Sequence, residues 1–459
     1  NKGHYNNSVQ RSDNMSELAH KKRYLTSFQI IILGFAAVVL LGALLLMLPI
    51  STQSGVITPF NEALFTSTSA VCVTGLVVQD TGSYWSTFGQ GVIIALIQIG
   101  GLGVVTIALA FTLLSGKKIS LKQRSLMQEA IAAPKVGGIV RLTGFILKAT
   151  LIIELLGALI MMPAFCQDYG LKGIWMAFFH SISAFCNAGF DILGRAGSLY
   201  PSLTNYVGSP SINIAIMLLI VVGGLGFLTW EDIAVNKFHI KRYRMQSKVI
   251  LLTTALLILL PALFFYFNEF MDLPVKERIL SSFFQSVTPR TAGFNTVNLA
   301  AMSTAAQGIM IVLMLIGGSP GSTAGGMKTT TFAVMLANAF AIFRKKEDAH
   351  FFGRRIDGSI VKNAATIFMM YITLFFIGAL IISVVEDLPL GTCLYETASA
   401  IGTVGLTLGI TPELGVLSQS ILIALMFIGR VGGLTLIYAA LSTTNKNLSK
   451  LPQGKITVG

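Results

Sequence analysis

The chain has 459 residues, of which 53% are hydrophobic and 12% are charged. Soluble domains carry about 25% charged residues, so this composition excludes a soluble globular protein and indicates an integral membrane protein. No polar stretch is long enough to form a separate soluble domain with its own core. The cysteines show no CxxC or Cys/His spacing and are expected to be packing residues. They are Cys72, Cys166, Cys186 and Cys393.

Four long apolar segments are predicted to cross the membrane as helices, because a span needs roughly 20 apolar residues. The polar stretch before the first segment, residues 1–25, has no small-residue cleavage site. It is interpreted as a cytoplasmic tail rather than a signal peptide. The four segments are residues 26–50, 142–165, 247–270 and 360–385.

A short amphipathic run follows each long segment, and a second apolar segment with a glycine-rich marker follows the run. The runs have about 10 residues, too few to span a bilayer but suitable for re-entrant helices. The runs are residues 59–69, 172–183, 276–286 and 389–399, and the second segments are 88–114, 210–235, 306–343 and 416–441. The markers read IGGLG (99–103), VGGLG (222–226), IGGSPG (316–321) and IGRVGG (428–433).

At the end of each short run lies a motif that aligns four times without gaps on one glycine. The copies are SAVCVTGL (69–76), SAFCNAGF (183–190), VTPRTAGF (287–294) and SAIGTVGL (399–406), with Gly75, Gly189, Gly293 and Gly405. We therefore predict an all-α membrane protein of four covalently linked repeats around a central pore, each a helix, a re-entrant helix and loop, and a helix. The predicted repeats are 26–116, 142–236, 247–343 and 360–442, with connections 117–141, 237–246 and 344–359 and a C-terminal tail, 443–459.

Most Lys and Arg residues lie in the tails and connections, which the positive-inside rule places in the cytoplasm together with both ends of the chain. The motif loops then open outward, where acidic residues outnumber basic ones and concentrate cations. The acidic residues include Asp80, Asp191, Glu386, Asp387 and Glu413.

Two spans and one re-entrant loop per repeat keep all four repeats parallel, so the four loops can surround one axis. Extended segments in such a ring can point backbone carbonyls inward and replace the hydration shell of a cation. Glycine suits this ring because it adopts backbone conformations that side chains disfavour. The C-terminal ends of the short helices would add negative potential at the centre.

The motif TVGL (403–406) looks like the TVGYG filter of potassium channels, shortened to one glycine. Together with VTGL, NAGF, TPRTAGFN and IGRVGGLT, it resembles the potassium transporter superfamily of Ktr, Trk and HKT proteins, over about residues 26–445. No further helix pair is predicted before residue 26, which points to a Ktr-type, KtrB-like pore subunit. The resemblance implies potassium uptake, and glycine at all four positions favours potassium over sodium. It implies potassium contacts with the backbone of Val73, Thr74, Gly75, Asn187, Ala188, Gly189, Thr291, Ala292, Gly293, Thr403, Val404 and Gly405.

The second segment of the third repeat contains GGSPGSTAGG (317–326), whose glycines and proline oppose a continuous helix. A loop at membrane depth is tolerated where it lines a cavity. Residues 317–327 are therefore interpreted as a gate loop below the filter, with a static kink as the alternative. The residues assigned to the gate are Gly317, Gly318, Gly321, Gly325, Gly326, Lys328 and Arg430.

Charged residues inside apolar segments are costly in a membrane and are presumed functional. Arg430 is expected to form an electrostatic barrier in the pore, or else to pair with Glu154. Glu154 is either a structural hydrogen-bonding residue or part of the pore lining, and Lys328 is expected to reach a carbonyl or cytoplasmic water. Arg290 is expected to brace its loop, with an acidic residue of a neighbouring repeat as its partner. His180 is expected to pack or hydrogen-bond rather than to bind a metal.

The resemblance further implies a homodimer on a cytoplasmic ring of RCK-type, KtrA-like subunits that bind ATP or ADP, in a prokaryotic cytoplasmic membrane. No cofactor is expected in this chain, and sodium is a candidate coupling ion beside the substrate potassium. The basic connections are candidate contacts for the ring or for membrane lipids, and no nucleic-acid partner is expected.

Two other functional classes stay open at this point. An alternating-access carrier for another cation would show inverted repeats and broken helices at the midplane. Parallel repeats argue against it, although the broken segment of the third repeat is a carrier-like feature. An intramembrane enzyme needs a nucleophile–base pair or a spacing such as HExxH. The sequence has neither of these and no ATP-binding P-loop, so no enzymatic activity is expected.

Overall fold

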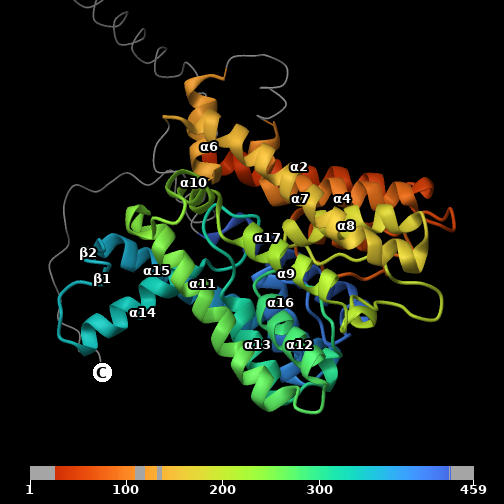
Figure 1. The fold of residues 1–459 in the computed structure, drawn as a ribbon. Coiled ribbons are helices and arrows are strands. Elements are labelled where there is room, and N and C mark those ends of the chain that lie inside the picture. The colour runs from red at the N-terminus through yellow and green to blue at the C-terminus, as the bar shows by residue number, and fades with distance from the viewer. Residues whose placement is uncertain (1–25, 109–118, 132–136, 434, 436–459) are drawn as a thin grey trace, which may run out of the picture.

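The computed structural model describes residues 26–108, 119–131, 137–433 and 435 (Figure 1). These residues are mostly helical, and their β-structure is one small hairpin of β1 (His350–Phe351) and β2 (Arg354–Arg355). The prediction of an all-α fold is confirmed. The predicted tails, 1–25 and 443–459, lie outside the described residues, and the connection 117–141 lies partly outside them.

Four long helices occupy the predicted first segments: α2 (Ser27–Leu46), α7 (Ile139–Tyr169), α11 (Met245–Phe264) and α15 (Gly358–Glu386). All four are long and apolar enough to cross a membrane, and a π-helical turn continues α11 to Glu269. The first of them starts at a capping box, in which Thr26 and Gln29 bond to each other's backbone amides. Leucines on the outer faces of these helices remain exposed, as expected for helices that meet lipid.

A short helix follows each long helix and packs against it: α3 (Phe60–Val71), α8 (Lys172–Phe185), α12 (Val275–Val287) and α16 (Leu390–Gly402). These four helices coincide with the predicted short runs. Proline precedes three of them, at Pro59, Pro274 and Pro389. Its fixed φ suits the extended backbone that enters a helix. Each short helix ends directly before the loop that carries the motif glycine.

The second apolar segments are broken in all four repeats, and not in the third alone, where the sequence predicted a loop. They form α4 (Thr87–Leu102), α9 (Pro210–Gly224) with α10 (Phe227–Asn236), α13 (Thr304–Leu315) with α14 (Thr329–Phe343), and α17 (Val416–Val431). The axes of α9 and α10 differ by 99°. Gly103 and Gly432 are the C-cap residues of α4 and α17, with φ of 90° and 88°, and Gly226, with φ of 90°, is the N-cap of α10. Such a backbone is inexpensive for glycine alone, which explains why the markers are rich in it.

The marker glycines also allow close packing behind the short helices. A Cβ built on Gly100 would collide with the carbonyl of Val71, at the end of α3. Gly223 and Gly429 stand in the same relation to the carbonyls of Phe185 and Ile401, at the ends of α8 and α16. A side chain at any of these glycines would push the second helix away from the filter motif.

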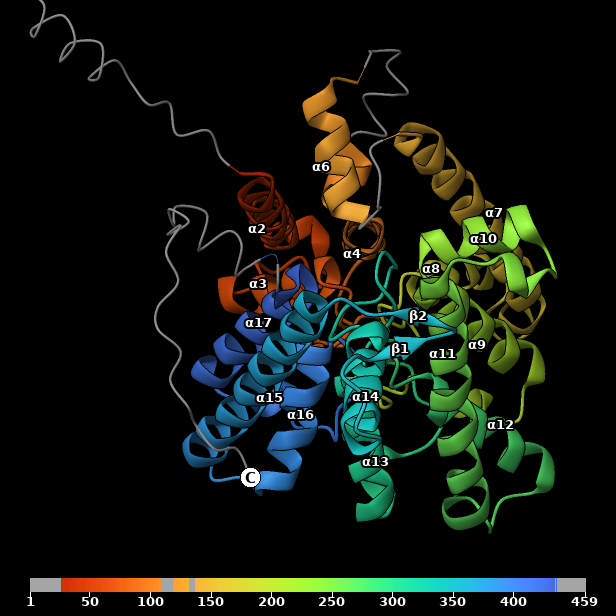
Figure 2. The same ribbon diagram turned by 90° about the vertical axis from the view of Figure 1, so that its left-hand side faces the viewer.

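Contacts between repeats run in a closed cycle. The second helix of each repeat touches the short helix of the next, in the pairs α4–α8, α9–α12 and α13–α16, and α17 returns to α3. Figure 2 shows α17 beside α16 of its own repeat and beside α3. The contact between α17 and α3 joins the last repeat to the first. The four motif loops lie inside this cycle. Short 3₁₀ turns at Pro49–Ser51, Thr204–Tyr206, Ile240–Arg242, Leu299–Ala301 and Thr411–Glu413 lie in the connecting loops.

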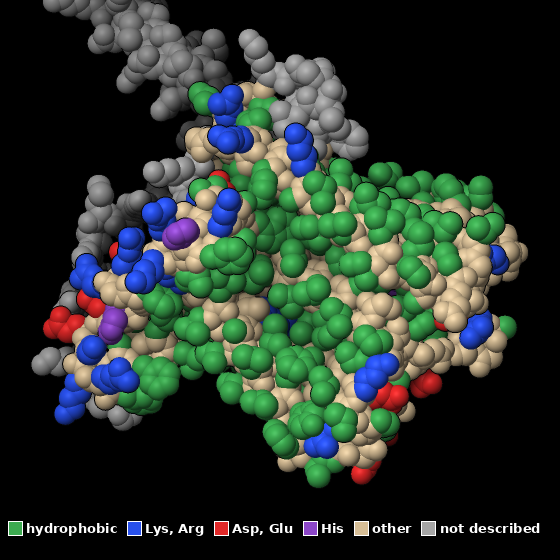
Figure 3. All heavy atoms as spheres, in the orientation of Figure 1, with side chains coloured by type: hydrophobic (Ala, Val, Ile, Leu, Met, Phe, Trp, Pro, Cys, Tyr) green, Lys and Arg blue, Asp and Glu red, His purple; other side chains and the backbone are tan. Residues whose placement is uncertain are grey.

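Hydrophobic side chains cover the face that α2, α7, α8, α9 and α11 present to the viewer (Figure 3). Lys and Arg side chains gather instead around α6 (Leu121–Ile131), α10 and the hairpin. An apolar belt with a basic rim at one end matches a protein that crosses a membrane with its basic connections on one side.

Candidate ion filter and gate

The backbone of the four motif loops repeats one unusual conformation. Val73, Asn187, Thr291 and Thr403 have φ of 51°, 57°, 72° and 52°. The glycines two positions later, Gly75, Gly189, Gly293 and Gly405, have φ of 93°, 68°, 86° and 95°. The residues between them, Thr74, Ala188, Ala292 and Val404, do not share the positive φ. Positive φ is uncommon outside glycine, so four identical alternating segments point to a common role for their backbone groups.

The four glycines form a ring in which each faces the next loop. A Cβ on Gly75 would collide with the carbonyl of Ala188, and one on Gly189 with that of Ala292. A Cβ on Gly293 would collide with the carbonyl of Val404, and one on Gly405 with the carbonyl of Thr74, so the cycle is closed. Glycine is therefore required at these positions both for its conformation and for the space that a side chain would fill. The structure brings all the predicted filter residues together.

Hydroxyl groups brace the loops from behind. In the first and fourth loops, Ser69 and Ser399 accept hydrogen bonds of 3.0 Å from the amides of Gly75 and Gly405. In the second loop, Ser183 donates instead to the carbonyl of Phe190 at 2.8 Å. Thr288 donates likewise to Phe294 in the third loop, at 2.5 Å. These contacts give a role to the Ser-Ala start of the motif, which the sequence displayed without explaining.

A cavity of about 110 Å³ lies on the outer side of the ring and touches all four filter glycines. Asp80 and Asp191 also line it. Asp80 accepts hydrogen bonds of 2.8 Å from the amides of Ser83 and Tyr200, so it ties the first repeat to the second. Burial raises the pKa of the Asp191 carboxyl to about 7, the Leu193 amide opposes this, and the Asp80 charge adds to it. Two of the acidic residues predicted for the mouth, Asp80 and Asp191, thus line one cavity together with the four motif glycines.

Glu396, which sequence reasoning missed, supports the fourth loop. It lies fully buried in α16 and accepts hydrogen bonds from Thr407 Oγ1, at 2.8 Å, and from Thr411 Oγ1. Both threonines follow the filter glycine, so the carboxylate holds the outer end of this loop. The available signal was an acidic residue within an otherwise uncharged short helix, LYETASAIG.

The predicted gate loop, residues 317–327, lies against the start of the fourth motif loop. A Cβ on Gly325 would meet the side chain of Thr403, and one on Gly326 would meet the carbonyl of Gly402. The two ends of the loop are joined by a bond of 2.7 Å from the Gly317 amide to the Met327 carbonyl. The whole loop is non-helical, as predicted: α13 ends before it at Leu315 and α14 begins after it at Thr329.

Markers of two other repeats satisfy the backbone of this loop. Ser319 and Thr323 donate their amides to the carbonyls of Gly224 and Gly223, at 3.0 and 3.2 Å. The Gly326 amide donates to Gly429 at 3.2 Å. Irregular backbone at membrane depth needs such partners inside the protein.

Arg430 links the gate loop to the first repeat. Its guanidinium donates to the carbonyls of Thr323 and Gly100, and to that of Gly101 at 3.0 Å. The alternative pairing with Glu154 is wrong, because that carboxylate accepts instead from Gln98, at 3.3 Å. Arg430 thus binds carbonyls at the end of α4 and in the middle of the gate loop.

Lys328 caps the end of the gate loop. Its ammonium donates to the carbonyls of Ala324 and Gly325, at 2.8 and 3.3 Å. Of the two expectations for this residue, the contact with a carbonyl is therefore the one observed. Both Lys328 and Arg430 line a cavity of about 290 Å³ on the inner side of the loop. Helix α6 closes part of that cavity through Glu129 and Ala130.

The remaining singled-out residues have structural contacts. Glu154 is buried and hydrogen-bonded to Gln98, which favours its structural interpretation. His180 bonds through Nδ1 to the Met176 carbonyl at 2.7 Å and stacks on an aromatic ring, as expected of a packing residue. Arg290 donates to the Thr254 carbonyl of its own repeat at 3.3 Å. The prediction of an acidic partner in a neighbouring repeat is therefore wrong. A backbone carbonyl accepts the hydrogen bond without the cost of removing a second charge from water, which a buried ion pair would require.

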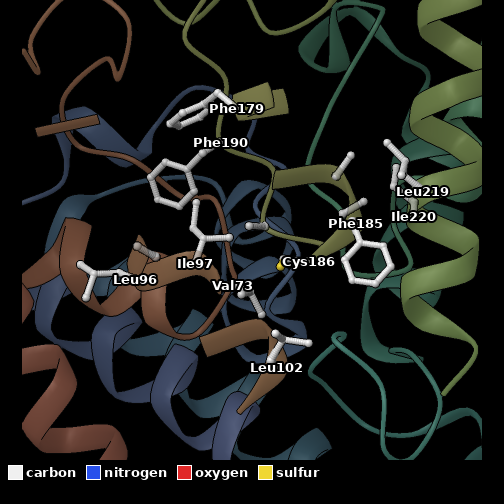
Figure 4. Close-up of a cluster of buried hydrophobic side chains, with 14 of the residues drawn as sticks. Val73, Leu96, Ile97, Leu102, Phe179, Phe185, Cys186, Phe190, Leu219 and Ile220 are labelled. Carbon is white, nitrogen blue, oxygen red and sulfur yellow. The ribbon is translucent and has the colours of Figure 1, made fainter. Parts of the chain in front are cut away.

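Apolar side chains fill the space around the first two loops (Figure 4). Phe185 lies on the side of Leu219 and Ile220, while Cys186 lies on the side of Val73. The cysteines Cys72, Cys166, Cys186 and Cys393 are free thiols, three of them buried. This packing fixes the loops from outside, so their conformation does not depend on the loops alone.

Comparisons with known proteins agree with a membrane transport protein. The TrkH family profile, described as a cation transport protein, matches residues 3–450. The potassium/sodium uptake protein NtpJ of Enterococcus hirae is 39% identical over 450 residues, covering 95% of this chain and 98% of that protein. The Ktr system potassium uptake protein B of Bacillus subtilis is 39% identical over 439 residues, covering 94% of this chain and 96% of that protein.

The fold has a counterpart among solved structures. The potassium transporter TrkH from Vibrio parahaemolyticus superposes with a TM-score of 0.71 at 19% identity, covering 91% of this chain and 85% of that one. The apolar helices and the family profile together define a multi-pass membrane protein of the cation-transport class. The chain belongs to the TrkH family of cation transport proteins.

Proposed function

We propose that this chain takes up potassium across the cell membrane through a channel-like filter built by its four motif loops. The observation that carries the proposal is the closed ring of filter glycines, each set against a carbonyl of the next loop. The names of its relatives, which include potassium and potassium/sodium uptake proteins, support the choice of cation.

The proposed potassium ligands are backbone carbonyls of the three-residue segments that end at each filter glycine. A ring of carbonyls replaces the hydration shell of the ion, which is the basis of filters in potassium channels. The short helices end at these loops, so the negative ends of their dipoles face the proposed site. The outer cavity with Asp80 and Asp191 would hold cations before they enter.

The loop at residues 317–327 is proposed as the gate. In the arrangement described here, Gly325 and Gly326 rest against the inner end of the fourth filter loop. Ions would pass only after the loop moves away, which requires the bond between Arg430 and the Thr323 carbonyl to break. The charges of Arg430 and Lys328, beside the inner cavity, form the proposed electrostatic barrier.

The proposed orientation places the filter mouth outside a prokaryotic cell and the basic connections in the cytoplasm. The gathering of Lys and Arg around α6, α10 and the hairpin supports it (Figure 3). A homodimer and a cytoplasmic RCK-type ring that binds ATP or ADP are proposed as the assembly, by resemblance to Ktr systems. Sodium is the proposed coupling ion, and the chain itself is proposed to hold no cofactor and to catalyse no reaction.

The direct test is rubidium uptake into vesicles that contain the purified chain. Uptake that external potassium inhibits at lower concentrations than sodium supports the proposal. Uptake of another cation that potassium does not inhibit would favour an alternating-access carrier instead. Empty vesicles and vesicles with heat-inactivated protein serve as controls.

A further inference from the structure

A cavity of about 410 Å³ lies beside the gate loop, next to the inner cavity. It is enclosed by the first turns of α11 and α15, by α14 and by the hairpin, and it touches the gate loop at Pro320. Because α11 and α15 are long enough to span the membrane and start here, the cavity lies at one surface of the membrane, which is the cytoplasmic surface in the proposed orientation. Its apolar lining includes Met245, Val249, Val334, Phe351, Ile356 and Ile360.

The chemistry of this cavity suits an amphiphile. Apolar cavities of this kind bind apolar groups, and the apolar group available at the membrane surface is a lipid acyl chain. Two amide side chains, Gln246 and Asn363, stand among the apolar ones. Neither has a hydrogen-bond partner among the described residues, so both are available to the glycerol and ester oxygens of a lipid.

The elements that border the cavity carry unpaired positive charge. Lys248 on α11, Arg354 on β2 and Lys362 on α15 form no ion pair within the described part of the chain, although none of them lines the cavity itself. The Lys248 ammonium donates to the Lys241 carbonyl at 2.9 Å and lies over the Phe352 ring, so it has no acidic partner but is held near the hairpin. The acidic residue nearest to them in sequence is Asp357, which caps α15 through a bond of 2.7 Å from the Ser359 amide. Basic pockets between spans at the cytoplasmic surface bind anionic lipid headgroups.

The cavity shares a wall with the cavity on the inner side of the gate. Pro320, Thr331 and Ile367 line both of them. Pro320 belongs to the gate loop, whose neighbour Gly321 accepts a bond of 2.7 Å from the Phe227 amide. A group that fills the cavity therefore contacts the gate loop at Pro320, one of the residues that separate this cavity from the inner one.

We propose that an anionic glycerophospholipid binds in this cavity, with one acyl chain against Pro320, and stabilises the gate loop in the arrangement seen here. The binding half of this inference is independent of the proposed transport function. The gating half rests on the proposed role of the loop at residues 317–327.

The binding half is tested by lipid retention. The purified chain is placed in nanodiscs of phosphatidylglycerol and phosphatidylethanolamine, and the retained lipid is counted by native mass spectrometry. The wild type is expected to keep one phosphatidylglycerol per chain. Ile360→Trp and Ala364→Phe, which fill the cavity, are expected to lose it, whereas Leu380→Phe, on the exposed face of α15, keeps it. Equal retention in the wild type and both filled variants would overturn the proposal.

The choice of headgroup has its own variants. Replacement of Lys248, Arg354 or Lys362 by Gln is expected to weaken phosphatidylglycerol binding roughly fivefold for each charge removed, with little effect on phosphatidylethanolamine. Unchanged binding in the triple variant would refute the anionic headgroup.

The gating half is tested by rubidium uptake at increasing fractions of phosphatidylglycerol. Uptake by the wild type is expected to fall as this lipid increases, while Ile360→Trp is expected to be insensitive to it. Equal sensitivity of both proteins, with lipid retained by the wild type alone, would remove the gating role and leave the binding site. Potassium binding measured by calorimetry verifies that the filled variants are folded.

Discussion

Loss of the Arg430 guanidinium should release the gate while leaving the filter intact. In Arg430→Gln, the loop loses the bond from the guanidinium to the Thr323 carbonyl, which belongs to the loop itself. The variant also loses the bonds from Arg430 to Gly100 and Gly101, but these carbonyls belong to the first repeat and not to the loop. The two hydrogen bonds from Lys328 to carbonyls of the loop are kept. The variant therefore removes one charged link between the loop and the rest of the protein.

The size of the effect follows from this count of bonds. A hydrogen bond from a charged donor contributes about 1.5–3 kcal/mol, and about 1.4 kcal/mol changes an equilibrium constant tenfold. The ratio of closed to open loops should therefore fall roughly tenfold to hundredfold. Because Arg430 touches no residue of the proposed filter, potassium affinity should change little.

The assay is the initial rate of rubidium uptake into vesicles, with potassium affinity measured by calorimetry on the same preparation. Arg430→Gln should raise the rate at nearly unchanged affinity. Arg141→Gln, which removes an exposed arginine at the start of α7, is the matched control and should change neither. An unchanged or lower rate for Arg430→Gln, at unchanged affinity, would refute the proposed link between this arginine and gating.

Three further outcomes are expected. Ser399→Ala leaves the buried Gly405 amide without its hydrogen-bond acceptor, at a cost of about 1–3 kcal/mol. The potassium affinity measured by calorimetry should therefore fall several-fold. Ser420→Ala, on the exposed face of α17, is the control and should leave the affinity unchanged. Glu396→Gln weakens the bonds from Thr407 and Thr411, so the midpoint of thermal unfolding should decrease by several degrees, and no decrease would contradict the supporting role of this carboxylate. Asp191 has a pKa of about 7, so it is charged above that pH and neutral below it; rubidium uptake at low ionic strength should fall between pH 8 and pH 6, and Asp191→Asn should remove this dependence.

The sequence predicts a structural feature well where one backbone conformation requires one residue type. The four filter glycines could be predicted because positive φ and a neighbouring carbonyl both exclude a side chain, and the motif repeats around them. The long helices and the short runs could be predicted from segment length and apolar content alone. The loop at residues 317–327 was visible for the same reason, since its glycines and proline oppose a helix.

Features that depend on contacts between repeats could not be predicted. The breaks at Gly103, Gly226 and Gly432 fall inside continuous apolar segments, where one glycine gives no local sign of its φ. Arg430 binds carbonyls of two other repeats, and Arg290 binds a carbonyl of α11, the long helix of its own repeat. Backbone carbonyls carry no sequence signature, so reasoning from the sequence proposed carboxylates as partners in their place.

The central claim is that the ring of glycines selects potassium, and calorimetric titration with potassium, rubidium, caesium and sodium tests it most directly, because binding does not require an open gate. Gly405→Ser places a Cβ against the Thr74 carbonyl at a φ of 95°, so it should distort the ring. Gly91→Ser, on α4 with no atom within 4 Å of the added Cβ, is the matched control. The account predicts tighter binding of potassium than of sodium in the wild type and in Gly91→Ser, with the preference lost or strongly reduced in Gly405→Ser. Equal binding of all four ions, or a preference that survives in Gly405→Ser, would contradict it.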